Sequence, residues 1–238
     1  MRKQFLRIAL PALLLLVFVP NVSAQDDERP EFKMACEQVL KLGLDKFMEA
    51  YGEQTQDYSN AGQKEAFQYY VNCKKPANDA LAAKTLSEAK RKQVDAVREE
   101  FNKFGTALWG LTYLEAGGGT MWGLISVGAY AEREDFMEKL IKAMAAPNRK
   151  SPAARRRTSA SLTRIQRWLS ANERKPFTEN SEPEDVAQSK VNYRETMKET
   201  QDALAHLRDL LRDLPDTAAE RLASAMESEA KNALADTH

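Results

Sequence analysis

The chain has 238 residues, with 35 basic and 35 acidic side chains and only two histidines. This length is enough for one large domain or two small ones, and either can bury a hydrophobic core. Its only histidines, His206 and the C-terminal His238, exclude the zinc and di-iron motifs that require several histidines, such as HExxH.

The first 24 residues have the pattern of a secretory signal peptide. Arg2, Lys3 and Arg7 form a positive start, residues 8–19 form an apolar core, and Val22-Ser23-Ala24 supplies the small residues of a cleavage site. The apolar core is shorter than the roughly 20 residues of a membrane span. We therefore expect an exported protein, periplasmic or extracellular, whose mature chain begins at about residue 25 with a net charge of about −3. A retained N-terminal anchor is the alternative.

Two cysteines, Cys36 and Cys73, remain after the expected cleavage. In an oxidising compartment an even pair predicts one disulfide, which contributes about 3–4 kcal/mol for a loop of this length. Both cysteines fall on apolar stripes with helical spacing, the first running from Phe32 to Tyr51 and the second beginning at Ala66. The disulfide should therefore join a helical hairpin from the inside, and Pro76 should end its second helix. Two buried free thiols are the alternative.

A longer helix is predicted next, because its apolar residues alternate in steps of three and four, the heptad seam typical of coiled coils. The seam residues are Val94, Val97, Phe101, Phe104, Leu108 and Leu111. We expect Gly117-Gly118-Gly119 to end this helix before a second apolar helix. Residues 30–146 are thus interpreted as a disulfide-stapled helical bundle around this Gly-rich apolar hairpin. A membrane-associated segment over residues 105–131 is the alternative, although its uncharged run is shorter than a bilayer span.

The C-terminal part is predicted as a second helical unit, over residues 159–236, so that the whole protein is all-α. Pro147 and Pro152 bound a basic linker over residues 147–158, and a short basic helix follows over 159–169. After a second linker, a long helix with another seam ends at Pro215, and a final helix follows. The last two helices should form an antiparallel hairpin because their connection is short. Their seam could instead serve a homo-oligomer.

Positive charge is concentrated in the middle of the chain. Residues 139–175 contain eleven lysines and arginines against one acidic residue, whereas residues 25–138 and 176–238 carry net charges of −6 and −7. We predict a docking surface for an anionic partner at Arg155, Arg156, Arg157, Arg164 and Arg167. An envelope polymer, a lipid head group or an acidic protein fits the expected compartment, whereas nucleic acid does not. The competing interpretation pairs these arginines within the chain, with Glu182, Glu184, Asp185, Glu195 or Glu199.

No motif in the sequence indicates a catalytic residue, a cofactor or a metal ligand. His206 could pair with Asp202 one helical turn earlier, and Glu132, Glu134, Asp135 and Glu138 could hold a cation, but ordinary helix surfaces explain both patterns. The glycine-rich turn lacks the lysine of a phosphate-binding loop. We therefore expect an exported, non-enzymatic interaction or scaffold protein. A membrane-associated protein is the first alternative, and an enzyme of unknown reaction is the second.

Overall fold

The computed structural model describes residues 32–115, 122–147, 150–173 and 183–235. These residues form eight α-helices and no strand, which confirms the all-α prediction. The helices are α1 (Cys36–Leu42), α2 (Leu44–Thr55), α3 (Asn60–Thr85), α4 (Glu88–Glu115), α5 (Trp122–Ala145), α6 (Pro152–Glu173), α7 (Pro183–Asp213) and α8 (Asp216–Ala235). The predicted signal peptide and the Gly117-Gly118-Gly119 turn lie outside the described residues.

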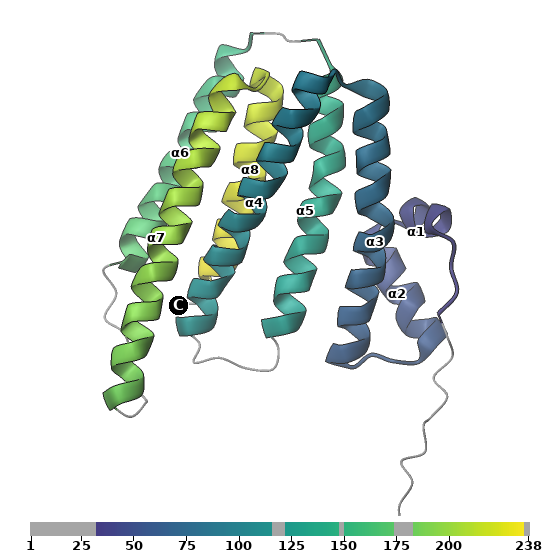
Figure 1. Cartoon of the computed structure of the whole chain (residues 1–238), viewed down its shortest axis with the longest axis horizontal. Helices are drawn as coiled ribbons and strands as arrows, with labels where there is room; N and C mark the ends of the chain where they lie inside the picture. Colours follow the sequence, from purple (N-terminus) through teal and green to yellow (C-terminus); the bar gives the residue numbers. More distant parts are fainter. Residues whose placement is uncertain (1–31, 116–121, 148–149, 174–182, 236–238) are drawn as a thin grey trace, which may run out of the picture.

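The six long helices, α3 to α8, form a bundle in which consecutive helices run in opposite directions (Figure 1). Three pairs make most of the contacts: α3 with α5, α6 with α8, and α4 with α7. The first two pairs are parallel, because each has one reversing helix between its members, whereas α4 and α7 are antiparallel. The bundle thus has two three-helix units, α3–α5 and α6–α8, which meet mainly through their middle helices.

A single hydrophobic core crosses both units. All six residues of the predicted α4 seam are buried, none of them more than 2 % exposed. The same core contains Met137 of α5, Leu169 of α6, Leu207 of α7 and Leu222 of α8. Helices α7 and α8 are antiparallel, as the sequence predicts, but α7 packs mainly along α4 and α8 mainly along α6. The helices before and after the predicted linker, residues 147–158, therefore contribute to one common hydrophobic core.

The Cys36–Cys73 disulfide is present, and it ties α1 to the middle of α3. Cys73 is buried in a second, smaller core formed by α1, α2, α3 and Ala131 of α5, whereas Cys36 is exposed at the first position of α1. The predicted apolar stripe around Cys36 is divided between α1 and α2 at Gly43, whose φ of +75° suits glycine.

The prediction that Pro76 ends a helix is wrong, because Pro76 lies inside α3. Proline cannot donate to the carbonyl one turn earlier, which costs about 3 kcal/mol in a helix interior. Residue 76 is exposed, so water can solvate that carbonyl, and the packing of α3 along α5 supports the helix on both sides of the proline. Tertiary packing therefore overrides the local signal.

The predicted basic linker is also shorter than expected, because α6 begins at Pro152. Ser151 caps the helix, since its Oγ accepts a hydrogen bond from the N–H of Ala154 at 3.2 Å. Proline is favourable at the first helical position, where its missing N–H would have no partner. Arg155, Arg156 and Arg157 consequently lie in the first turns of a helix rather than in a linker.

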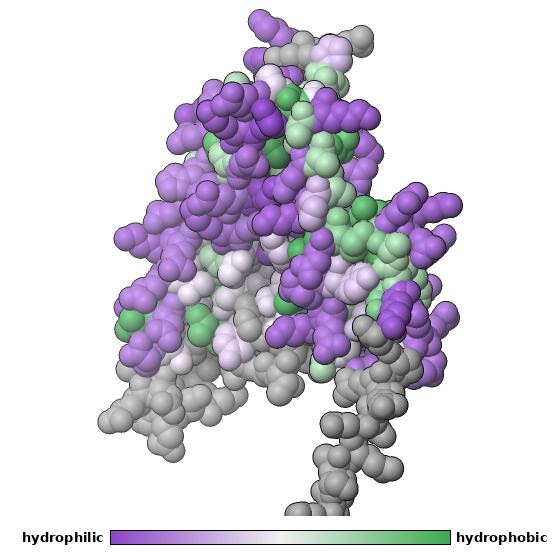
Figure 2. Space-filling view, turned by 45° about the vertical axis from the view of Figure 1, so that its right-hand side comes forward, coloured by the Kyte–Doolittle hydropathy of each residue, from purple (hydrophilic) through white to green (hydrophobic). Residues whose placement is uncertain are grey.

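None of the described helices combines the length and the apolarity that crossing a bilayer requires. Within the segment predicted as membrane-associated, Leu108, Leu111, Ala129 and Ala131 are buried in the protein, and Tyr113 and Ile125 are exposed. Hydrophilic residues cover most of the face shown in Figure 2, where hydrophobic residues gather in the region of α1 to α3. The described apolar residues of this segment thus mainly build the core.

Candidate anion-binding site

The basic face of α6 lies along acidic residues of α8. The ion pairs are Arg155–Asp216, Arg157–Glu220 and Arg164–Glu227. The second and third are bidentate, with Nη2–Oε2 distances of 3.0 and 2.7 Å in addition to the bonds through Nε. Because α6 and α8 are parallel, the partners are a nearly constant 61 or 63 residues apart.

The alternative in which the acidic C-terminal hairpin neutralises the basic helix thus occurs for Arg155, Arg157 and Arg164, but the partners are on α8 and are not the acidic residues named from the sequence. Neither Glu195 nor Glu199 forms a described ion pair with α6, and Glu182 lies outside the described residues, as do the side chains of Glu184 and Asp185. Arg156 and Arg167 are exposed and form no ion pair within the described part of the chain. The five predicted arginines therefore do not act as one free surface.

A cavity of about 450 Å³ lies where the start of α6 meets the end of α7 and the start of α8. Arg155 of α6 and Arg208 and Arg212 of α7 line it, together with the hydroxyl groups of Thr158 and Ser159. The apolar part of the lining is supplied by Leu162, Leu211, Leu214 and Ala219. Three arginines from two helices therefore line one partly apolar cavity.

Asp216 orients Arg155 at this cavity. Its carboxylate accepts a hydrogen bond from the backbone N–H of Ser151 at 2.6 Å. The single N–H of Arg155 Nε is shared between its two oxygens, at 2.9 Å from Oδ1 and 3.1 Å from Oδ2. The Ser151 N–H and then the Arg155 guanidinium hold the pKa of Asp216 below its usual value, so the carboxylate is ionised at neutral pH. Arg155 donates to it through Nε alone.

The cavity carries a net positive charge. Arg212 is paired with Asp209 on its own helix at 2.9 Å, whereas Arg208 has no ion pair among the described residues. Three guanidinium groups against the carboxylates of Asp209 and Asp216 leave a charge of about +1. An arginine binds a phosphate or carboxylate through paired hydrogen bonds, so this arrangement suits an anionic group.

Arg208 and Arg212 were missed in the sequence, which singled out only the arginines of α6. They stand one helical turn apart just before Pro215, and alternating helix directions bring the end of α7 to the start of α6. The signal in the sequence is that one helix ends with arginines and another begins with them, at ends that alternating helix directions place on the same side of a bundle.

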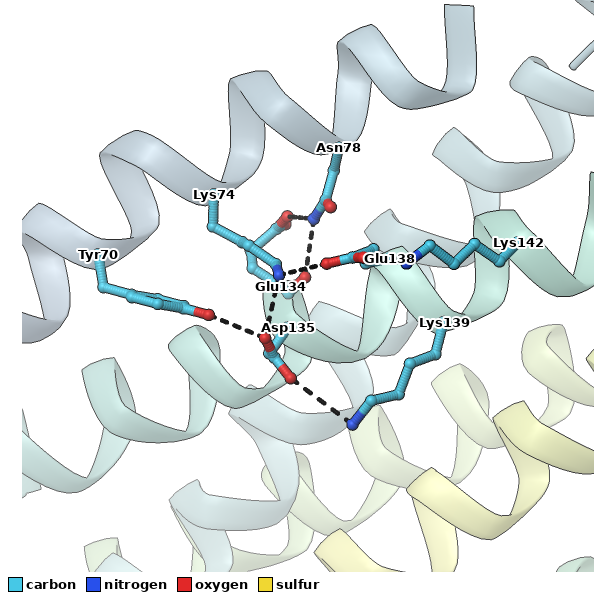
Figure 3. Close-up of polar contacts among 8 residues, drawn as sticks. All are labelled: Tyr70, Lys74, Asn78, Glu134, Asp135, Glu138, Lys139 and Lys142. Carbon is cyan, nitrogen blue, oxygen red and sulfur yellow. Dashed lines mark hydrogen bonds and ion pairs between the residues drawn. The ribbon is translucent and has the colours of Figure 1, made fainter. Parts of the chain in front are cut away.

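Three of the four carboxylates considered as a cation site, Glu134, Asp135 and Glu138, instead join α5 to α3 in a polar network (Figure 3). The fourth, Glu132, is exposed and lies outside this network. Lys74 contacts Glu138 Oε2 at 2.6 Å and Asp135 Oδ1 at 3.1 Å, and Tyr70 donates to Asp135 Oδ1 at 2.8 Å. Asn78 donates to the backbone carbonyl of Glu134 at 2.7 Å. We call Tyr70, Lys74, Asn78, Glu134, Asp135 and Glu138 the α3–α5 network.

The three carboxylates of the α3–α5 network are compensated by Lys74 together with three cations outside the network, namely Arg98, Lys139 and Lys142. Burial alone would raise the pKa of Asp135, but hydrogen bonds from Tyr70 and Lys74 outweigh it and lower that pKa. Hydrogen bonds from Lys142 and Lys74 lower the pKa of Glu138. The Lys74 side chain is only 6 % exposed and is already engaged by both carboxylates. The described residues contain no group of three or more potential metal ligands, so the network ties two parallel helices together.

His206 does not pair with Asp202 in the structure. Its Nδ1 lies 3.3 Å from Glu100 Oε2 on α4, across the antiparallel α4–α7 pair. Both residues line an open groove of about 890 Å³ in which Glu99, Glu199 and Asp202 also lie. The lining of this groove contains no cysteine and no second histidine. Because its charged residues are mainly carboxylates, the groove is an acidic surface open to solvent.

Comparisons with known proteins give no relative of this chain. No protein-family model matches it, and neither a curated protein nor a solved structure does so. Function therefore has to be inferred from the chemistry of the chain's own residues.

Proposed function

We propose that the protein is an exported, non-enzymatic docking protein that binds an anionic group of an envelope polymer in the cavity between α6, α7 and α8. The presence of Arg155, Arg208 and Arg212 together in the lining of that cavity carries the proposal. Hydrogen bonds to charged groups are stronger than those between neutral ones, and the hydroxyl of Ser159 adds a donor beside the arginines.

Export rests on the predicted signal peptide and is supported by the disulfide, because disulfides persist mainly in oxidising compartments. A binding role without chemistry is supported by the lining itself. It contains no histidine or cysteine, and its one carboxylate, Asp216, is occupied by Ser151 and Arg155. A group that transfers protons near neutral pH is therefore missing from this lining.

A polymer fits better than a lipid head group. A protein that docks on a bilayer through a basic site commonly adds exposed apolar side chains that enter the interface. The large apolar side chains that are exposed in the described residues are Leu42, Tyr58, Tyr113, Ile125 and Val191. None of them lines the cavity.

Binding can be measured on the oxidised protein with two soluble probes, inorganic polyphosphate and polyglutamate, and with phosphatidylglycerol vesicles as a third. If three arginines contact a phosphate polymer, affinity should fall roughly 20- to 40-fold between about 50 and 200 mM salt. Arg155→Gln combined with Arg208→Gln should weaken polymer binding by about tenfold or more.

The matched control is Arg91→Gln combined with Arg194→Gln, which removes two exposed arginines away from the cavity. This control should keep the binding of the parent protein to within about twofold, because long-range charge effects are screened at physiological salt. Equal losses in both double variants would refute a specific cavity. Stronger retention on the vesicles than on either polymer would show that a membrane, not a polymer, is the partner.

A further inference from the structure

The cavity between α6, α7 and α8 combines positive charge with apolar side chains, and the combination restricts the class of ligand that it can hold. Its lining contains Arg155 and Arg208 as well as leucines from both α6 and α7. Arg155 and Ser159 are exposed and Arg208 is half-buried. A ligand that enters the cavity can therefore reach these polar side chains.

The uncompensated charge of the cavity belongs to Arg208. Arg155 is paired with Asp216 and Arg212 with Asp209, whereas Arg208 forms no hydrogen bond or ion pair within the described part of the chain. One excess positive charge is balanced by a singly charged group, such as a carboxylate. A phosphate monoester carries a charge of about −1.5 to −2 at neutral pH and would leave negative charge in excess.

On both helices a polar side chain of the lining lies one helical turn from an apolar one. Ser159 and Leu162 are three positions apart on α6, and Arg208 and Leu211 are three positions apart on α7. Residues at this spacing are neighbours on a helix, with Cβ atoms about 5–6 Å apart. A ligand that contacts both members of such a pair must carry its hydrocarbon group within a few bonds of its anionic group.

The apolar side chains of the lining favour a short hydrocarbon group. Leu162 is half-buried, and Leu211, Leu214 and Ala219 are buried residues that still line the cavity. Burial of one methylene group against such side chains raises affinity about fourfold. The volume of about 450 Å³ lies in the lower half of the usual range for ligand pockets, so a small ligand fits.

We propose that the cavity binds the terminal carboxylate of a peptide branch whose last residue has an aliphatic side chain. In such a terminus the carboxylate and the side chain leave the same Cα atom, as the spacing on both helices requires. The carboxylate contacts Arg208 and the Nη groups of Arg155, which no hydrogen bond among the described residues uses. The aliphatic side chain packs against Leu162 and Leu211.

This inference rests on the proposed function, because it names the anionic group of the envelope polymer that enters the cavity. Polyphosphate offers the charge without a hydrocarbon group. In a phospholipid, glycerol and ester groups separate the phosphate from the acyl chains, so its charge and its hydrocarbon lie too far apart for residues one helical turn apart.

Three small probes separate the contributions of charge and hydrocarbon on the unaltered oxidised protein: N-acetyl-leucine, N-acetylglycine and N-acetyl-leucinamide. Proton–nitrogen correlation spectra measure each affinity from the backbone amide signals of Ser159 and Arg208. N-acetyl-leucine should bind about tenfold more tightly than N-acetylglycine, because it can bury at least two further methylene equivalents. It should also bind at least about tenfold more tightly than the uncharged amide, which lacks a charged hydrogen-bonding group.

The outcomes distinguish this inference from the proposed function. Equal affinities for N-acetyl-leucine and N-acetylglycine would overturn the inference and leave anion docking intact. Arginine-dependent binding of polyphosphate without binding of N-acetyl-leucine would do the same. If neither the polymers nor the two carboxylates bind, or if N-acetyl-leucinamide binds as tightly as N-acetyl-leucine and the polymers do not bind, both proposals fail.

Two variants then locate the ligand. Leu162→Ala removes part of the apolar lining without changing any charge, and it should reduce the ratio of N-acetyl-leucine to N-acetylglycine affinity to below about fourfold. Arg208→Gln should weaken both carboxylates at least about tenfold and keep their ratio. The control is Val191→Ala on α7, which removes an exposed apolar side chain outside the lining and should alter neither affinity.

Circular dichroism and thermal unfolding identify the folded variants. If Leu162→Ala fails to fold, Arg208→Gln and the three probes decide. A parental affinity ratio in folded Leu162→Ala, or parental affinities in folded Arg208→Gln, would refute the assignment.

Discussion

Gly105→Ala tests whether the buried Arg133–Glu229 pair requires a glycine on α4. The added Cβ would lie 2.1 Å from Arg133 Nη1 and 2.5 Å from Glu229 Oε1, so both side chains would have to move. Alanine is about 1 kcal/mol more favourable than glycine in a helix interior. Breaking a buried ion pair costs about 3–5 kcal/mol, so the free energy of unfolding should fall by about 2–4 kcal/mol.

The guanidinium is the end of a flexible side chain, but it has little freedom to move aside. Arg133 is 6 % exposed, and moving it would break its hydrogen bonds to Asn102 and Glu229 together. Urea unfolding of the oxidised protein measures the change. Gly123→Ala is the matched control, because its Cβ would meet only Lys64 Nζ, at 3.8 Å.

Gly123→Ala should leave the free energy of unfolding unchanged or raise it by up to about 1 kcal/mol. The two substitutions are chemically identical, so a difference in sign isolates the contact at Gly105. If Gly105→Ala is as stable as the parent protein, the Arg133–Glu229 pair can rearrange without loss. The structural requirement for glycine would then be refuted.

Three further predictions use the same unfolding assay. Leu207→Ala empties a fully buried site on α7 and should lower the free energy of unfolding by about 2–5 kcal/mol, whereas exposed Val191→Ala should change it by less than about 0.5 kcal/mol. Cys73→Ser removes the disulfide and should cost about 3–4 kcal/mol; parental stability in this variant, or in reducing buffer, would contradict that. The α3–α5 network lowers the pKa of two carboxyls in the folded state, so its stabilisation is present above their unfolded pKa of about 4 and is lost as pH falls below it. Lys74→Met should therefore reduce the slope of the free energy of unfolding against pH in the acidic range, whereas the exposed Lys92→Met should leave that slope unchanged. Equal slopes in the two variants would refute the role of Lys74.

Helix content and the disulfide could be predicted because both depend on features that are local or easily counted. A repeat near 3.6 residues marks helices, and an even pair of cysteines in an exported chain indicates one bond. The apolar seam from Val94 to Leu111 identified core residues for the same reason, and all of its predicted positions are buried. Helix boundaries were predicted less well, because Pro76 was treated as a terminator and Pro152 as part of a linker.

The candidate anion site shows the same limit. Arg155 was identified from local charge density, but its pairing with Asp216 and its approach to Arg208 depend on the parallel packing of α6 and α8 and the position of α7. Arginines that are adjacent in sequence also differ in their contacts. Arg157 is paired with Glu220, whereas Arg156 is exposed and forms no ion pair in the described residues. Side chains one position apart on a helix point in different directions, so composition alone does not distinguish them.

By itself, the sequence determined the all-α class, the disulfide partners and the buried seam of α4, because periodicity and cysteine number act within short segments or on single pairs. Only the tertiary structure decided which helices are neighbours, which arginines are neutralised and where Gly105 admits the Arg133–Glu229 pair. Similar amphipathic helices can pack in many orders with comparable burial of apolar area. Contacts between residues 61 to 96 positions apart become definite only once one packing order is selected.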